Sequence, residues 1–248
     1  MVGVSSALAL QARGKSVLLV DRGAPGRETS YGNAGVIERE QFIPVAPPRA
    51  LGPLLTYALN RQPEAHYHLS FLPRILPWLW RLFRETSDEG IERYAMAMNP
   101  IAAAALSEHI GFAQAANAMG FFRDTGWLRL YRRRAQFDAD QTLYEYCRRF
   151  GVDYQVYDSK GLFELEPHLA PLFAVATNVP STWTVSSPGG VTEAYARLFA
   201  ERGGTIAVGD ARSLAVGTGS FQVETAQGRA TAAASGNRMA RAVSRSSA

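Results

Sequence analysis

The chain has 248 residues, of which 47% are hydrophobic and 19% charged, a composition typical of a globular protein with one large or two small domains. Residues 229–248 hold four of the 26 basic residues and none of the 22 acidic ones, so the net charge of +4 belongs to this segment and argues against nucleic-acid binding by the rest. A single cysteine, Cys147, excludes an internal disulfide and is interpreted as a buried structural thiol.

The N-terminal residues have the pattern of the second half of a dinucleotide-binding βαβ unit. Apolar spacing predicts a helix over Val4–Ala12, and Lys15–Val20 predicts a parallel strand that is buried on both faces. Gly3 stands 18 residues before Asp21, which ends this strand. In such units the last glycine lets helix and strand pack closely, and the acid binds a ribose hydroxyl. The first strand and the first two glycines would precede Met1.

A helical region follows a Gly-, Ser- and Asn-rich loop at residues 22–35. Ser87 and Asp88 are suitable N-caps for one of its helices. The predicted helices are Leu51–Asn60, Phe71–Arg84, Ile91–Met98 and Pro100–Met119.

The next region is predicted to contain both strands and helices. Alternating residues predict a β-hairpin over Gly120–Arg132, with its turn at Asp124–Gly126. The remaining predictions are a helix at Ala135–Phe150, a strand at Tyr154–Tyr157, a helical segment at Ser159–Glu166 and an extended segment at Val175–Val185.

An α/β pattern returns after Pro188. The sequence Pro188-Gly-Gly precedes a predicted helix at Thr192–Arg202 and a strand at Thr205–Val208. Three further short strands are expected to form an antiparallel meander, at Arg212–Val216, Phe221–Thr225 and Arg229–Ala232.

The order of these elements predicts an α/β fold, α+β overall. A Rossmann-like nucleotide-binding domain at 1–43 and 187–232 is interrupted by a mixed antiparallel-sheet and helical domain at 44–186. We expect both domains to be incomplete and residues 233–248 to form a disordered tail.

Three motifs resemble one family. Glu28-Thr-Ser-Tyr-Gly-Asn-Ala-Gly35 is similar to the flavin-contacting loop of the D-amino acid oxidase superfamily, most of all in the bacterial D-amino acid dehydrogenase small-subunit group. Glu164-Leu-Glu-Pro167 resembles a Leu-Glu-Pro sequence of the same superfamily. Val185-Ser-Ser-Pro-Gly-Gly-Val191 resembles the segment that returns the chain to the flavin domain.

The resemblance implies a two-domain flavoprotein with non-covalent FAD. It would oxidise the Cα–N bond of a (D-)amino acid by hydride transfer to the flavin, giving a 2-oxo acid and ammonia. A quinone chain or oxygen would accept the electrons, and the location would be cytoplasmic, with peripheral inner-membrane association as an option. The cofactor-binding residues that it implies are Gly3, Asp21, Arg22, Thr29, Ser30, Asn33, Ala34 and Gly35.

No motif identifies a catalytic residue. Side chains suited to a substrate carboxylate are Tyr57, His66, His68, Arg74 and Arg129, and none is singled out by spacing. His66 and His68 have no third ligand in sequence, so no metal site is predicted.

The segment Phe71–Phe83 is aromatic and basic. A buried amphipathic helix is the preferred interpretation, and a helix at a membrane surface is the alternative.

Two other interpretations of the chain stay open. Because the family's members are longer at both ends, this chain is also interpreted as an inactive or poorly folded fragment that binds FAD weakly or not at all. A frameshift or faulty gene model near residue 233 and an internal start at Met1 are the hypotheses for its ends. The third reading is an NAD(P)-dependent dehydrogenase, because an acid at a strand end serves either dinucleotide.

Overall fold

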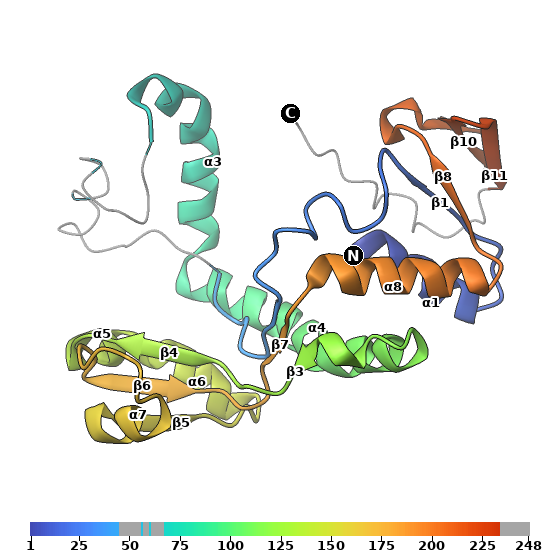
Figure 1. Cartoon of the computed structure of the whole chain (residues 1–248). Helices are drawn as coiled ribbons and strands as arrows, with labels where there is room; N and C mark the ends of the chain where they lie inside the picture. Colours follow the sequence, from blue (N-terminus) through green and yellow to red (C-terminus); the bar gives the residue numbers. More distant parts are fainter. Residues whose placement is uncertain (45–55, 57–59, 61–66, 234–248) are drawn as a thin grey trace. The chain divides into compact units, whose positions relative to one another are not determined.

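The computed structural model describes residues 1–44, 56, 60 and 67–233 (Figure 1). The chain divides into two compact units whose segments alternate along the sequence. Unit 1 comprises Met1–Val36, Ser107–Arg123 and the residues from Thr184 onward, and unit 2 comprises Ile37–Leu106 and Asp124–Trp183. The predicted helix at 51–60 and the tail beyond residue 233 lie outside the described residues, except for residues 56 and 60.

Unit 1 contains a short parallel sheet. Its strands are β1 (Leu18–Asp21) and β8 (Thr205–Val208), with Leu18 opposite Thr205 and Asp21 opposite Val208. The predicted burial of the strand at Lys15–Val20 on both faces was wrong, because Leu18 is 40% exposed and no residue of β1 is fully buried. Among the described residues the sheet has two strands, and the two helices that cover it also contact each other, so they lie on one face.

These two helices are α1 (Val2–Ala12) and α8 (Pro188–Glu201). They run in the same direction, because the Gln11 side chain donates to the carbonyl oxygens of Phe199 and Arg202 at 3.0 and 3.3 Å, while the N-terminal Met1 lies near Thr192. α8 begins four residues earlier than predicted, since proline is accepted at the first helical position and Ser187 caps the Gly190 N–H.

A third helix also contributes to unit 1. α4 (Asp88–Ala115) is continuous, whereas the sequence predicted a break at Pro100, so the loss of one backbone hydrogen bond is tolerated there. Ser87 accepts a hydrogen bond from the Gly90 N–H, as its predicted role as N-cap requires. The last part of the helix packs on α8, where the Tyr195 hydroxyl donates to the His109 carbonyl at 2.9 Å.

The predicted hairpin at Gly120–Arg132 is wrong. β3 (Phe122–Arg123) pairs with β7 (Trp183–Val185), and β4 (Leu128–Tyr131) pairs instead with β6 (Val175–Asn178). The Asn178 side chain accepts from the Trp127 N–H at 3.1 Å and holds the segment between β3 and β4 against β6. Long-range pairing therefore replaces the local turn.

The meander is confirmed, with strands β9 (Ala215–Gly217), β10 (Ser220–Thr225) and β11 (Gly228–Ala233) in antiparallel order β11-β10-β9. A 3-10 turn, η3 (Ala211–Ser213), precedes it. β2 (Val36–Ile37) joins β7 at the point where the chain leaves unit 1.

Unit 2 contains a three-stranded antiparallel sheet of order β4-β6-β5, with β5 at Gln155–Asp158. The predicted helix at 135–150 is divided at Asp140 into two helices, and the extended segment at 175–185 into β6 and β7. The helical elements of this region are α3 (Leu72–Glu85), α5 (Arg134–Ala139), α6 (Gln141–Arg149) and α7 (Ser159–Leu165), with 3-10 turns η1 (Leu69–Phe71) and, in unit 1, η2 (Met119–Phe121).

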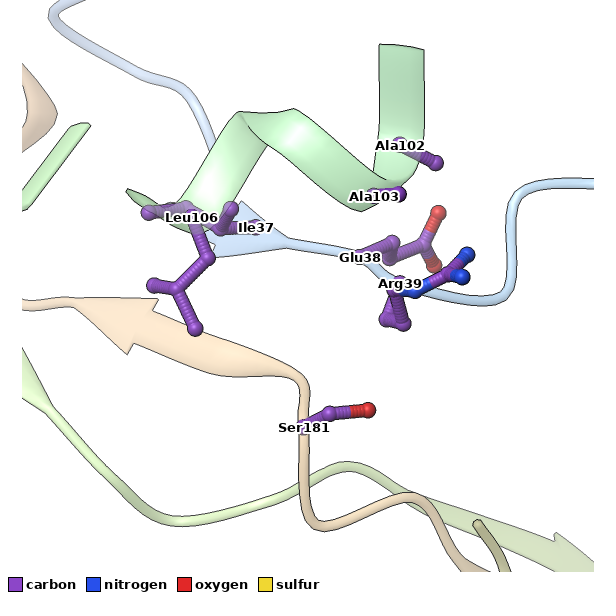
Figure 2. Close-up of a pocket in the computed structure, with 7 residues that line it drawn as sticks. All are labelled: Ile37, Glu38, Arg39, Ala102, Ala103, Leu106 and Ser181. Carbon is purple, nitrogen blue, oxygen red and sulfur yellow. The ribbon is translucent and has the colours of Figure 1, made fainter. Parts of the chain in front are cut away.

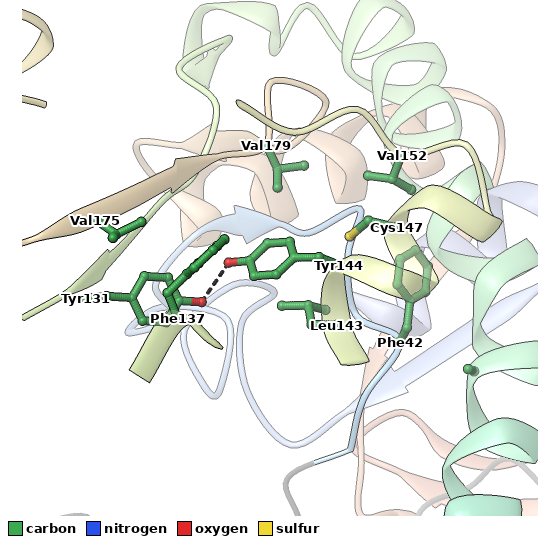
Figure 3. Close-up of a cluster of buried hydrophobic side chains, with 10 residues drawn as sticks. Phe42, Tyr131, Phe137, Leu143, Tyr144, Cys147, Val152, Val175 and Val179 are labelled. Atoms are coloured by element: carbon green, nitrogen blue, oxygen red, sulfur yellow. Dashed lines mark hydrogen bonds between the residues drawn. The ribbon is translucent and has the colours of Figure 1, made fainter. Parts of the chain in front are cut away.

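The core of unit 2 surrounds a chain of hydroxyl groups (Figure 3). The Tyr144 hydroxyl lies 2.6 Å from that of Tyr131 and 2.8 Å from Thr177 Oγ1. Tyr131 also donates to Asp140 at 3.0 Å. Cys147 is fully buried beside these rings, and burial raises the pKa of its thiol to about 11, in agreement with a structural thiol. Each buried hydroxyl has a partner, so this polar chain fixes how helix α6 sits on the sheet.

Replacing Tyr144 by phenylalanine tests the structural role of these hydrogen-bonded hydroxyl groups. The change removes the hydroxyl that joins Tyr131 to Thr177, so we expect the free energy of unfolding to fall by about 1–3 kcal/mol. Urea denaturation of the variant and of Tyr31→Phe, whose ring is 65% exposed, gives the comparison. Equal stability of the two variants would contradict a structural role for the chain.

Candidate functional site

The ends of four elements meet at one end of unit 1. Each helix runs antiparallel to the strand that follows it, so the N-termini of α1 and α8 and the carboxyl ends of β1 and β8 lie together. The Met1 amino group donates to Ser30 Oγ at 3.0 Å, which places the loop at 22–35 at this end as well. In open α/β sheets, ligands bind at the carboxyl ends of the strands.

This end of the unit favours an anion. Two helix N-termini carry partial positive charge and N–H groups without intrahelical partners. Burial lowers the pKa of the Met1 amino group, and the negative charge of Asp21 opposes that shift. The Asp21 carboxylate itself is exposed and accepts a hydrogen bond from the Gly23 N–H at 3.3 Å.

Close backbone contacts hold the loop at 22–35 against α8. Gly26 has φ +82°, and a Cβ there would lie 2.5 Å from the Gly189 carbonyl oxygen. Gly35 has φ +72°, and a Cβ there would overlap the Val185 carbonyl oxygen. An ion pair of 3.1 Å between Arg27 and Glu193 joins the same two segments. The sequence did not single out Gly26, Arg27 or Glu193; the Gly-Gly at the start of α8 was the signal that could have found this contact.

The eight predicted cofactor-binding residues all lie on this end of unit 1 and its loop. Arg22, Thr29, Asn33 and Ala34 are exposed. Asn33 Oδ1 accepts from the Gly35 N–H at 2.8 Å, which leaves the Asn33 amide N–H groups for a ligand. Gly3 is less constrained than predicted, since a Cβ there would meet Leu19 Cδ1 at 3.4 Å, an ordinary contact.

Unit 2 contains a separate pocket of about 180 Å³ (Figure 2). Its apolar wall comes from Ile37 and from one face of α4, and its polar groups are Glu38, Arg39 and Ser181. Figure 2 shows the Glu38 carboxylate and the Arg39 guanidinium extending from the segment that follows β2. None of the predicted cofactor-binding residues lines this pocket.

Polar atoms without partners gather in this part of unit 2. Arg39 Nη1, Glu40 Oε1 and Asn99 Oδ1 are buried and have no hydrogen-bond partner among the described residues. Asn99 lies one turn before the α4 residues that line the pocket. The other Glu40 oxygen accepts from the Thr182 hydroxyl at 2.8 Å. A buried polar atom without a partner costs free energy, so a ligand with polar groups would be favoured here.

The charges of the pocket influence one another. Burial raises the pKa of Glu38, and Glu40 raises it further, while Arg129 lowers it. Burial lowers the pKa of Arg39, opposed by Cys147 and Glu40. Arg129, a substrate candidate from the sequence, therefore lies within electrostatic reach of the pocket.

The other side chains suited to a substrate carboxylate are exposed or lie outside the described residues. Tyr57 and His66 lie outside the described residues, whereas His68 and Arg74 are exposed. No group of three metal-binding side chains occurs in the part of the chain that the structure describes. In the same part, no helix has the length and apolar character to cross a membrane.

A family model and the related sequences agree on one protein family. The family model described as DAO, FAD dependent oxidoreductase, matches residues 1–243. A D-amino-acid oxidase of Bradyrhizobium diazoefficiens is 28% identical over 198 residues, 79% of this chain and 47% of that protein. A D-amino acid dehydrogenase 1 of Mesorhizobium japonicum is 28% identical over 170 residues, 68% of this chain and 41% of that protein.

Solved structures share the fold. Glycine oxidase from Geobacillus kaustophilus aligns with a TM-score of 0.61 at 16% identity, covering 92% of this chain and 49% of that protein. L-amino acid deaminase from Proteus myxofaciens aligns with a TM-score of 0.61 at 15% identity, covering 91% and 40%. The chain thus spans about half the length, or somewhat less, of the relatives that it matches.

Gly35→Ala tests the contact between the loop and β7. Because Gly35 has a positive φ and no space for a Cβ, we expect a loss of at least about 2 kcal/mol in the free energy of unfolding. Gly32→Ala is the matched control, since a Cβ at Gly32 would meet nothing within 4 Å. Thermal or urea unfolding measures both variants, and an unchanged Gly35→Ala protein would show that the contact is unimportant.

Proposed function

The chain belongs to the DAO family of FAD dependent oxidoreductases, and we propose that it binds FAD non-covalently in unit 1 and serves the oxidation of a D-amino acid. The observation that carries the FAD part is the meeting of two helix N-termini, two strand ends and the loop at 22–35. Members of the family bind FAD, and several relatives are named D-amino acid oxidase or dehydrogenase. FAD, when bound, supplies the hydride acceptor for oxidation of the Cα–N bond, after which the imine hydrolyses to a 2-oxo acid and ammonia.

The residues of unit 1 fit the adenosine and phosphate parts of such a cofactor. The exposed Asp21 carboxylate at the end of β1 would accept hydrogen bonds from the ribose hydroxyl groups. The helix N-termini stabilise the phosphate charge. Thr29 and Asn33 offer a hydroxyl group and amide N–H groups along the loop. Gly26 and Gly35 support this arrangement, because their backbones hold the loop close to Gly189 of α8 and to Val185 of β7.

The pocket of unit 2 is our candidate for the amino acid. A zwitterion needs a cation for its carboxylate and an acceptor for its ammonium group, and Arg39 and Glu38 supply both. Arg39 Nη1 is already desolvated and unpaired among the described residues, so pairing with a carboxylate recovers a hydrogen bond that the protein lacks. Ile37, Leu106 and the alanines of α4 form an apolar wall for a small side chain.

The proposal also includes a cytoplasmic location, with peripheral attachment to the inner membrane as an option, and a quinone chain or oxygen as electron acceptor. The relatives named dehydrogenase and oxidase are consistent with either acceptor.

The visible spectrum of the purified chain tests FAD binding. We expect flavin absorbance after reconstitution with FAD and removal of free cofactor, and bleaching on anaerobic addition of a D-amino acid. Asp21→Asn should weaken FAD affinity by about tenfold, because it removes a charged acceptor, whereas Asp153→Asn at an exposed site should not. A colourless protein that binds no flavin would refute the proposal for this chain, and NADH binding in its place would favour a nicotinamide-dependent dehydrogenase.

Arg39→Gln tests the amino acid pocket. The loss of a charged, bidentate donor should raise the dissociation constant of a D-amino acid by about tenfold or more, measured by calorimetry without turnover. Arg132→Gln removes an exposed arginine and is the control. If both variants bind the amino acid as tightly as the natural chain, the pocket does not hold it.

A further inference from the structure

Helix α3 has an unusual surface for its composition. No residue of α3 is buried, although most are apolar. Leu76 is 54% exposed, Trp78 57% and Trp80 63%. The preferred interpretation from the sequence, a buried amphipathic helix, is therefore wrong for the described residues.

The side chains of α3 separate onto two faces. With about 100° between successive residues, the apolar side chains cover an arc of about 200°. The opposite face carries Arg74, Arg81 and Arg84. The apolar arc consists of Leu72, Ile75, Leu76, Trp78, Leu79, Trp80, Leu82 and Phe83.

The two tryptophans lie at the edges of the apolar arc rather than at its centre. Trp78 is next to Arg74 on one edge, and Trp80 is next to Arg84 on the other. Indole rings prefer the boundary between an apolar layer and a polar one, and arginine side chains beside them can extend to phosphate groups. A helix that pairs with another protein surface usually buries its tryptophans at the centre of the contact instead.

The free charges of this helix are positive. Its single acidic residue, Glu85, forms an ion pair with Arg93 of α4 at 3.1 Å. None of the three arginines of α3 forms an ion pair with another described residue. The exposed surface of α3 is therefore complementary to a negatively charged partner.

We propose that α3 binds the surface of an anionic lipid membrane. The helix lies in the membrane plane, its apolar arc enters the region between headgroups and acyl chains, and its arginines contact lipid phosphates. Each arginine contributes about a fivefold gain in partitioning onto an anionic surface. This inference rests on the peripheral membrane attachment proposed above and assigns that attachment to α3. Its test needs no FAD, so it can fail while FAD binding by unit 1 holds.

Vesicle co-sedimentation of the full chain tests the proposal. We expect binding to phosphatidylcholine vesicles that contain phosphatidylglycerol, much weaker binding to phosphatidylcholine alone, and loss of binding at high salt. Tryptophan emission should shift to shorter wavelength on binding. Replacing Arg74, Arg81 and Arg84 together by glutamine should reduce binding about a hundredfold.

Leu76→Glu places a charge within the apolar arc, between Phe83 and Trp80 on the helix surface, and should abolish binding. Ile101→Glu, at a position of α4 that is 62% exposed, is the matched control and should bind as the natural chain does. Circular dichroism of both variants shows whether the helices persist.

Three results would overturn the proposal. The first is equal binding to neutral and anionic vesicles. The second is full binding by Leu76→Glu. The third is vesicle binding that is absent while Leu76→Glu dissociates a dimer seen by light scattering, which would assign the face to a second copy of the chain.

Discussion

The close contact between two backbone segments determines the candidate site in unit 1. Gly26 faces the Gly189 carbonyl, and Gly35 faces the Val185 carbonyl, with no room for a side chain at either glycine. These contacts and the ion pair between Arg27 and Glu193 hold the loop in place. Thr29 and Asn33 remain exposed at the end where helix N-termini and strand ends meet, which is the arrangement that an anionic dinucleotide requires.

Unit 2 uses its polar groups in two ways. The hydroxyl groups of Tyr131, Tyr144 and Thr177 satisfy one another inside the core and cost little, because every member has a partner. Arg39 and Glu40 each keep one buried atom without a partner among the described residues. Native proteins rarely leave such atoms unsatisfied away from sites of function, and this contrast is why we place the amino acid beside Arg39.

Local patterns in the sequence predicted most single elements. α1, β1, α7, β8 and the meander of β9, β10 and β11 occur where apolar spacing and turn residues indicated them. The predictions failed where a distant partner decided the outcome. Asp124–Gly126 has the residues of a hairpin turn, yet β3 pairs with β7, about sixty residues later in the chain, and β4 pairs with β6, about fifty residues later. The break expected at Pro100 is absent because one missing hydrogen bond does not end a helix that is buried at Ala95 before the proline and at Ala102 after it.

By itself, the sequence determined the α/β elements α1, β1, α8 and β8, the acid at the end of β1, and the loop motif that led to the FAD family. It did not indicate that residues 107–123 join unit 1. Each depends on residues that are neighbours in the chain. Only the tertiary structure decided that Gly26 and Gly35 support the loop, that Glu38 and Arg39 line a pocket, and that α3 exposes its apolar face. These properties depend on which surfaces meet, and burial and close packing join residues whose separation in sequence carries no local signal.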